Sequence, residues 1–192
     1  MQMNNWEEGK MKNQWKPIFA MLMLIPALAS SSVFAAPAAS NGKAPVMIAG
    51  EVRHRLLRLP YYGVFDWLEC EIRPDNSVVL RGQVTRPTLK SDAEVVLHRI
   101  EGVTKVENQI QVLPISTSDD QLRVAIYRSL FSYNGPMFRY AIQDAPPIHI
   151  IVDKGRVTLK GSVDNSADSQ IATFVANGIS GVLEVRNELK AE

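Results

Sequence analysis

The chain has 192 residues, with 21 Lys and Arg against 20 Asp and Glu, and apolar residues make up 46% of it. A nearly neutral chain has no overall positive charge with which to attract nucleic acid, so any attraction to an anionic surface must come from a local patch. Cys70 is the single cysteine, which excludes an internal disulfide and leaves no cysteine near the N-terminus to accept a lipid anchor.

The first 35 residues predict a secretory signal peptide. Lys12 and Lys16 precede an apolar run over residues 18–29, and residues 33–35 carry small or β-branched side chains at the positions that a signal peptidase reads. This run is shorter than the roughly 20 residues that span a bilayer, so we expect cleavage after Ala35 and no transmembrane span in the mature form. Translation from Met11 in place of Met1 would give a more typical signal. Residues 36–45 are expected to form a flexible leader.

The first folded unit is expected over residues 46–113. Apolar side chains at helical spacing predict a helix that Pro60 ends. Alternating apolar residues at 68–72 and 78–84, on either side of a turn at 74–77, predict a β-hairpin. A second helix is predicted from Pro87 until Gly102, and residues 103–112 are predicted to form a third strand.

The second folded unit is expected over residues 118–190. Ser118 is predicted to cap its first helix, because Gln121 follows at the spacing of a capping box. Strands are predicted at 148–152 and 157–163, a helix at 171–176 and a last strand at 182–189. Residues 142–147 are an insertion relative to the first unit. The linker, residues 113–117, is short and favours a fixed arrangement of the two units.

The two units are repeats of one another. Residues 78–110 align without a gap with residues 157–189 and share 11 identities over 33 positions, all of them Val, Leu, Ile, Ala, Gly or Asn. Such identities preserve packing and turns, so the repeat reports on scaffold and not on chemistry. The order α-β-β-α-β predicts an α+β fold in which two helices cover one face of a three-stranded sheet in each unit. Gly82 and Gly161 are interpreted as sites of close helix packing.

Three motifs occur in both units. A Val-x-Leu-x-Gly-x-Val strand lies at 78–84 and 157–163, a central helical alanine at Ala93 and Ala172, and Gly-Val-x-x-Val-x-Asn at 102–108 and 181–187. With these motifs, both units resemble the BON (bacterial osmotic-shock and nodulation) domain. The resemblance implies a periplasmic, osmotically induced envelope protein that binds phospholipid or membrane surfaces or acts as a chaperone. It also implies no enzyme activity, and it points to the segment from Leu122 to Tyr140 as the lipid-binding region.

That segment carries aromatic rings, a methionine and arginines, which are the residue types that settle at a membrane–water interface. The candidate residues are Arg128, Phe131, Tyr133, Met137, Arg139 and Tyr140. Phe131, Tyr133 and Tyr140 are expected to be exposed. The alternative is that Phe131, Met137 and Phe138 seal the core between helix and sheet.

A second candidate surface lies on the first helix, where Arg53, Arg55 and Arg58 cluster before the aromatic segment 61–67. Three arginines could each add about 1 kcal/mol of attraction near an anionic surface. Alternatively, they form a solvated helix face or dock the other unit.

No catalytic, cofactor or metal site is expected. The histidines at 54, 98 and 149 lie on different elements without metal-ligand spacing, and Cys70 alternates with Leu68 and Ile72 as a buried, unreactive residue would. Glu69 and Glu71 are interpreted as the solvated face of a strand.

The sequence therefore supports one hypothesis and one alternative. The hypothesis is a non-catalytic periplasmic binding module that engages anionic phospholipid weakly and in a salt-sensitive way, through the second unit assisted by the first helix. The alternative is a soluble periplasmic chaperone or adaptor that holds envelope protein clients on the same apolar cluster or on an exposed sheet edge. No nucleic-acid partner is expected.

Overall fold

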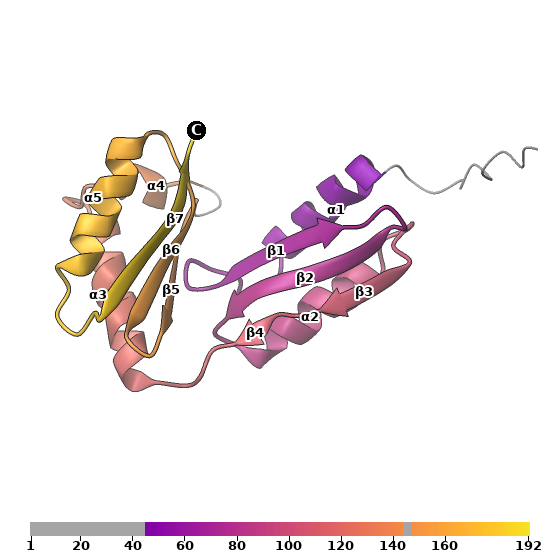
Figure 1. The fold of residues 1–192 in the computed structure, drawn as a ribbon, viewed down its shortest axis with the longest axis horizontal. Coiled ribbons are helices and arrows are strands. Elements are labelled where there is room, and N and C mark those ends of the chain that lie inside the picture. The colour runs from indigo at the N-terminus through magenta and orange to yellow at the C-terminus, as the bar shows by residue number, and fades with distance from the viewer. Residues whose placement is uncertain (1–44, 144–146) are drawn as a thin grey trace, which may run out of the picture. The chain divides into compact units, whose positions relative to one another are not determined.

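The computed structural model describes residues 45–143 and 147–192. The predicted signal peptide, its cleavage site, the alternative start at Met11 and the leader before Pro45 lie outside the described residues. The α+β fold class is confirmed, with two successive units that each pack helices against their own sheet (Figure 1).

In the first unit, the hairpin and the crossover helix form as the alternation of apolar residues predicts. The elements are α1 (Pro45–Leu57), β1 (Trp67–Ile72), β2 (Ser77–Val84), α2 (Pro87–His98), β3 (Lys105–Asn108) and β4 (Gln111–Val112). Strand β1 runs antiparallel to β2, while β3 and β4 both pair with β2 in parallel. The predicted third strand is thus interrupted between Asn108 and Gln111. The apolar side chains of α1, α2 and the sheet form one core.

The second unit repeats this order. Its elements are α3 (Thr117–Phe131), α4 (Phe138–Ala141), β5 (Ile148–Asp153), β6 (Arg156–Val163), α5 (Ser166–Asn177) and β7 (Glu184–Ala191). The sheet order is β5-β6-β7, and α3 and α5 lie on the same face of it (Figure 1). The short helix α4 was not predicted. The predicted cap Ser118 is wrong, because Ser116 precedes α3 and its hydroxyl accepts the amide of Asp119 at 3.2 Å.

The glycines shared by the two units face a neighbouring strand, which corrects their interpretation as helix-packing sites. Gly82 has φ of 132° and Gly161 has φ of 117°, a region that side-chain-bearing residues rarely adopt. A Cβ atom at Gly82 would collide with the carbonyl of Trp67, and one at Gly161 would collide with that of Pro147. Each glycine therefore allows the antiparallel partner strand to approach closely.

The loop before β1 touches the second unit. The amide of Ile150 in β5 donates to the carbonyl of Val64 at 2.8 Å, and the side chains of Val64 and Phe65 pack against the second unit's core. Asp66 braces this loop from within the first unit: it is 3% exposed and accepts the amide of Thr85 at 2.7 Å and that of Gly63 at 3.2 Å.

Candidate functional site

The predicted exposure of Phe131 and Tyr140 is wrong. Phe131 is 7% exposed, Met137 is fully buried and Tyr140 is 2% exposed, and all three belong to the second unit's core. The reason is the turn after α3, in which the amide of Met137 donates to the carbonyl of Leu130 at 2.9 Å and leads the chain back into α4. The alternative interpretation, in which Phe131 and Met137 seal the core, is the one that the structure supports.

Tyr133 is exposed as predicted. Its side chain is 82% exposed, and its ring lies 5.4 Å from that of Phe138. Ile142, which was not singled out from the sequence, is 70% exposed on the same connection. These two side chains are the apolar groups of the segment 132–143 that water reaches most.

Arg139 is not a free cation. Its guanidinium donates to Asp164 at 3.1 Å, to the hydroxyl of Tyr140 at 3.1 Å and also to Asp168. The Tyr140 hydroxyl donates in turn to Asp168 at 2.7 Å. Burial raises the pKa of Tyr140, and the hydrogen bond to Asp168 adds to this effect. Arg139 and Tyr140 therefore form a polar clamp between α4 and the start of α5.

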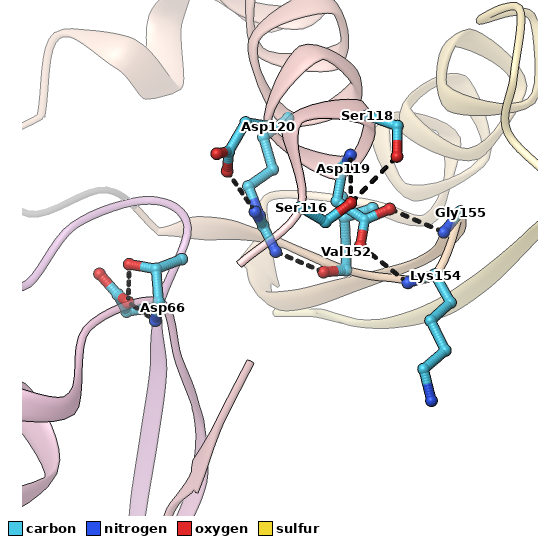
Figure 2. Close-up of polar contacts among 10 residues, drawn as sticks. Asp66, Ser116, Ser118, Asp119, Asp120, Val152, Lys154 and Gly155 are labelled. Carbon is cyan, nitrogen blue, oxygen red and sulfur yellow. Dashed lines mark hydrogen bonds and ion pairs between the residues drawn. The ribbon is translucent and has the colours of Figure 1, made fainter. Parts of the chain in front are cut away.

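The start of α3 is fixed by side chains that the sequence analysis did not single out (Figure 2). Asp119 is 3% exposed and accepts the amides of Lys154 and Gly155, each at 2.9 Å, so it holds the turn between β5 and β6. Arg123 is also 3% exposed and donates to Asp120 and to the carbonyl of Val152, each at 2.5 Å. The only signal in the sequence was two aspartates in a first helical turn, which is a common pattern.

These contacts leave α3 with little free charge. Three of its four charged side chains, Asp119, Asp120 and Arg123, are engaged in the bonds just described. The guanidinium of Arg128 is exposed and makes no hydrogen bond or ion pair with the described residues. The second unit thus offers one available cation on its first helix.

Helix α1 presents a broader surface that combines apolar and basic side chains. Val46 is 82% exposed, Met47 62% and Leu57 44%. At about 100° per residue, these three side chains fall on one side of the helix, with Arg53 beside them; Arg58 follows directly after the end of the helix. Arg55 differs, because it pairs with Glu51 at 2.7 Å.

Groups that could support chemistry are sparse. Burial raises the pKa of the half-buried Cys70 thiol, which disfavours its reactive thiolate. Within residues 45–143 and 147–192, no cluster of three or more His, Cys, Asp or Glu side chains could hold a metal ion. No helix in this part of the chain is long and apolar enough to cross a membrane.

The fold and the repeated motifs agree with the match to known families. The BON domain model matches residues 46–114 and again residues 118–192, so the chain belongs to the BON domain family and carries two copies of the domain.

Among characterised proteins, the chain is 25% identical over 125 residues to the osmotically-inducible protein Y of Escherichia coli K12. The match covers 65% of this chain and 62% of that protein.

Among solved structures, it is similar to CdsD, a structural protein of the type III secretion system of Chlamydia trachomatis, with a TM-score of 0.31 and 13% identity over 77% of this chain and 64% of that one. The C-terminal domain of CdsD gives a TM-score of 0.28 and 10% identity, over 78% of this chain and all of that domain.

Proposed function

We propose that this protein is a non-catalytic binding module of the bacterial periplasm that attaches to anionic phospholipid surfaces and contributes to envelope integrity under osmotic stress. Membership of the BON domain family and similarity to osmotically-inducible protein Y support the setting. The signal-like N-terminal sequence supports export.

One observation carries the lipid-binding part of the proposal. Helix α1 exposes Val46, Met47 and Leu57, with Arg53 beside them on the helix and Arg58 directly after its end. A helix that lies in a membrane interface buries apolar side chains among acyl chains while flanking cations meet phosphate groups. We therefore assign the main contact to α1, with Arg128, Tyr133 and Ile142 of the second unit as an additional contact. The sequence analysis assigned the main lipid contact to the second unit and an assisting contact to the first helix. The proposal exchanges these two roles, because Arg139 and Tyr140 form hydrogen bonds within the second unit.

The test is flotation of the processed chain, residues 36–192, with vesicles of phosphatidylglycerol and phosphatidylethanolamine at low ionic strength. Reversing one interfacial arginine changes the local charge by two, so Arg58→Glu should lower the partition coefficient about 30-fold, at about 1 kcal/mol per charge. Arg186→Glu is the matched control, because Arg186 is an exposed arginine on β7 without an ion-pair partner among the described residues. Loss of the same size in both variants, or no retention of the unmodified chain, would refute the proposal.

A further inference from the structure

The second sheet has its β5 edge closed by the protein itself. In an antiparallel pair, main-chain groups of alternate residues point outward, and the bond from the Ser162 amide to the Pro147 carbonyl places the even-numbered residues of β5 on the outside. The outward amide of Ile150 donates a hydrogen bond to the carbonyl of Val64, and the outward carbonyl of Val152 accepts one from the guanidinium of Arg123. A loop and a buried arginine thus occupy this edge.

The corresponding edge of the first sheet is open. Leu80 and Leu159 are equivalent residues of the two repeats, and they pair with Cys70 and Ile150, respectively. Cys70 of β1 therefore corresponds to Ile150 of β5, and Ile72 corresponds to Val152. The bond from the Arg73 amide to the Ser77 carbonyl places the main-chain groups of Cys70 and Ile72 on the outside of β1. Within the described residues, nothing bonds to them there. The Tyr62 hydroxyl bonds to the main chain of Leu68, two residues before Cys70.

The residue that closes β5 is replaced in the first unit. Leu122 and Ile126 of α3 occupy the core positions that Ile48 and Val52 occupy in α1, so Ala49 stands where Arg123 stands in the second unit. Because alanine cannot reach the strand, a groove of about 450 Å³ remains beside it. This groove is lined by Ala49, Arg53, Leu56 and Leu57 of α1, by Trp67 of β1, and by Pro147 and His149 of the second unit, among others.

The groove offers both apolar surface and unmet polar groups. The volume lies within the range of about 300–1,000 Å³ of ligand-binding pockets. Trp67 lines the groove, and its indole N–H is buried without an acceptor among the described residues. The Glu69 carboxylate stands at the rim and makes no hydrogen bond or salt bridge with the described part of the chain, whereas the Glu71 carboxylate pairs with Arg81 at 2.6 Å. The Glu69 carboxylate interacts electrostatically with Arg81 but is not bonded to it, so it can still accept a hydrogen bond from a peptide cation.

We propose that the open edge of β1, beneath Ala49 of α1, binds an extended polypeptide segment that carries a large apolar residue next to a basic one. The segment would add to β1 as a further strand, with hydrogen bonds to Cys70 and Ile72. Its apolar side chain would enter the groove, and its lysine or arginine would face Glu69. The chain contains its own precedent, since the Val64–Phe65 segment meets the equivalent position of β5 with one main-chain bond and two apolar side chains. This protein-binding site lies next to the lipid surface of α1 and shares Leu57 and Arg53 with it.

The probe is a fluorescent synthetic peptide of alternating valine and lysine with a central phenylalanine, titrated by the processed chain and followed by anisotropy. Ala49→Arg supplies the first unit with the second unit's closing residue and should weaken binding at least about tenfold. Gly50→Arg is the matched control, because Gly50 is exposed and has no atom near its missing Cβ.

Cys70→Pro removes one outward amide without touching a bond to β2, and it should weaken binding to a similar extent, whereas Cys70→Thr should not.

Two further measurements separate this site from lipid binding. A peptide with glutamate in place of lysine should bind less tightly than the lysine peptide, and Glu69→Lys should invert that order. Arg58→Glu should leave peptide binding unchanged, and Ala49→Arg should leave vesicle flotation at least as strong as before. The proposal is overturned if the lysine peptide fails to bind at millimolar concentration. It is equally overturned if binding survives both Ala49→Arg and Cys70→Pro in variants that melt as the unmodified chain does.

Discussion

Asn187 accepts the amide of Leu189 with its side-chain oxygen at 3.0 Å, and this bond lies on the outer edge of β7. The side-chain nitrogen of Asn187 donates to Ser169 and Thr173 of α5. Asn108 repeats the arrangement in the first unit: its side-chain oxygen accepts the amide of Ile110 at 3.1 Å, and its side-chain nitrogen donates to α2. The asparagine that closes the Gly-Val-x-x-Val-x-Asn motif thus fastens a helix to an edge strand and occupies an outward amide.

Removing these asparagines should destabilise the units unequally. Asn108 is half-buried and donates to the Lys90 carbonyl and the Glu94 carboxylate, whereas Asn187 is exposed. We expect Asn108→Ala to lower the free energy of unfolding by about 1–3 kcal/mol, because buried polar groups lose their partners, and Asn187→Ala to lower it by less. Urea denaturation measures both. A greater loss for Asn187→Ala would contradict this account.

The strand glycines should not tolerate alanine. Gly82→Ala and Gly161→Ala place a methyl group on a carbonyl of the neighbouring strand at an unfavourable φ, so each should cost about 3 kcal/mol or more. Gly50→Ala is the control of opposite sign, because a solvent-facing glycine inside α1 should gain about 0.5–1 kcal/mol on replacement. Thermal melts of the three variants measure the order, and a Gly82→Ala chain as stable as the unmodified one would exclude the close strand contact.

Arg139 and Arg128 should separate stability from membrane attachment. Arg139→Ala removes the partner of Asp164 and of the nearly buried Asp168, so the second unit should lose about 1–3 kcal/mol. Arg128→Ala touches no described partner and should leave the unfolding curve unchanged while weakening vesicle retention. The opposite pattern, with a stable Arg139→Ala chain that no longer binds vesicles, would restore Arg139 as a lipid contact.

Stability should fall at alkaline pH through Tyr62. Burial raises the pKa of Tyr62 from 10.0 to about 12, and Asp66 adds to the effect. Because the unfolded chain releases this proton first, the contribution of Tyr62 is fully present below pH 10 and is lost as the pH rises towards about 12. Tyr62→Phe should flatten this part of the stability curve, while Tyr61→Phe, which alters a side chain that is 71% exposed, should not. Urea unfolding across this pH range makes the comparison, and equal slopes would contradict the assignment.

The sequence was informative about the fold because apolar periodicity reports directly on which face of a helix or strand is buried. Residues such as Val78, Leu80 and Val84 alternate as they pack, and the repeat doubles the signal. The break between β3 and β4 was not foreseen, because alternation continues across it. The cap of α3 was misplaced by two residues, since Ser116 and Ser118 are both capping residue types and only the backbone geometry selects Ser116.

The candidate site was less predictable for a physical reason. Composition does not distinguish an aromatic side chain that faces water from one that a following turn folds inward, so Tyr133 and Tyr140 looked alike and ended 82% and 2% exposed. The open edge of β1 depends on a difference between the units, Ala49 against Arg123. It becomes visible only when the helices are superposed by their buried positions.

The β1 edge differs from the other strand edges in what it offers to a partner strand. In the described residues, Asn108 and Asn187 each bond one outward amide at one edge of their sheet, Val64 and Arg123 cover part of the β5 edge, and β1 exposes the main-chain groups of Cys70 and Ile72 beside a groove. A partner strand added to β1 would cover this edge, so the proposed complex would shield exposed main-chain groups of both chains from further strand addition.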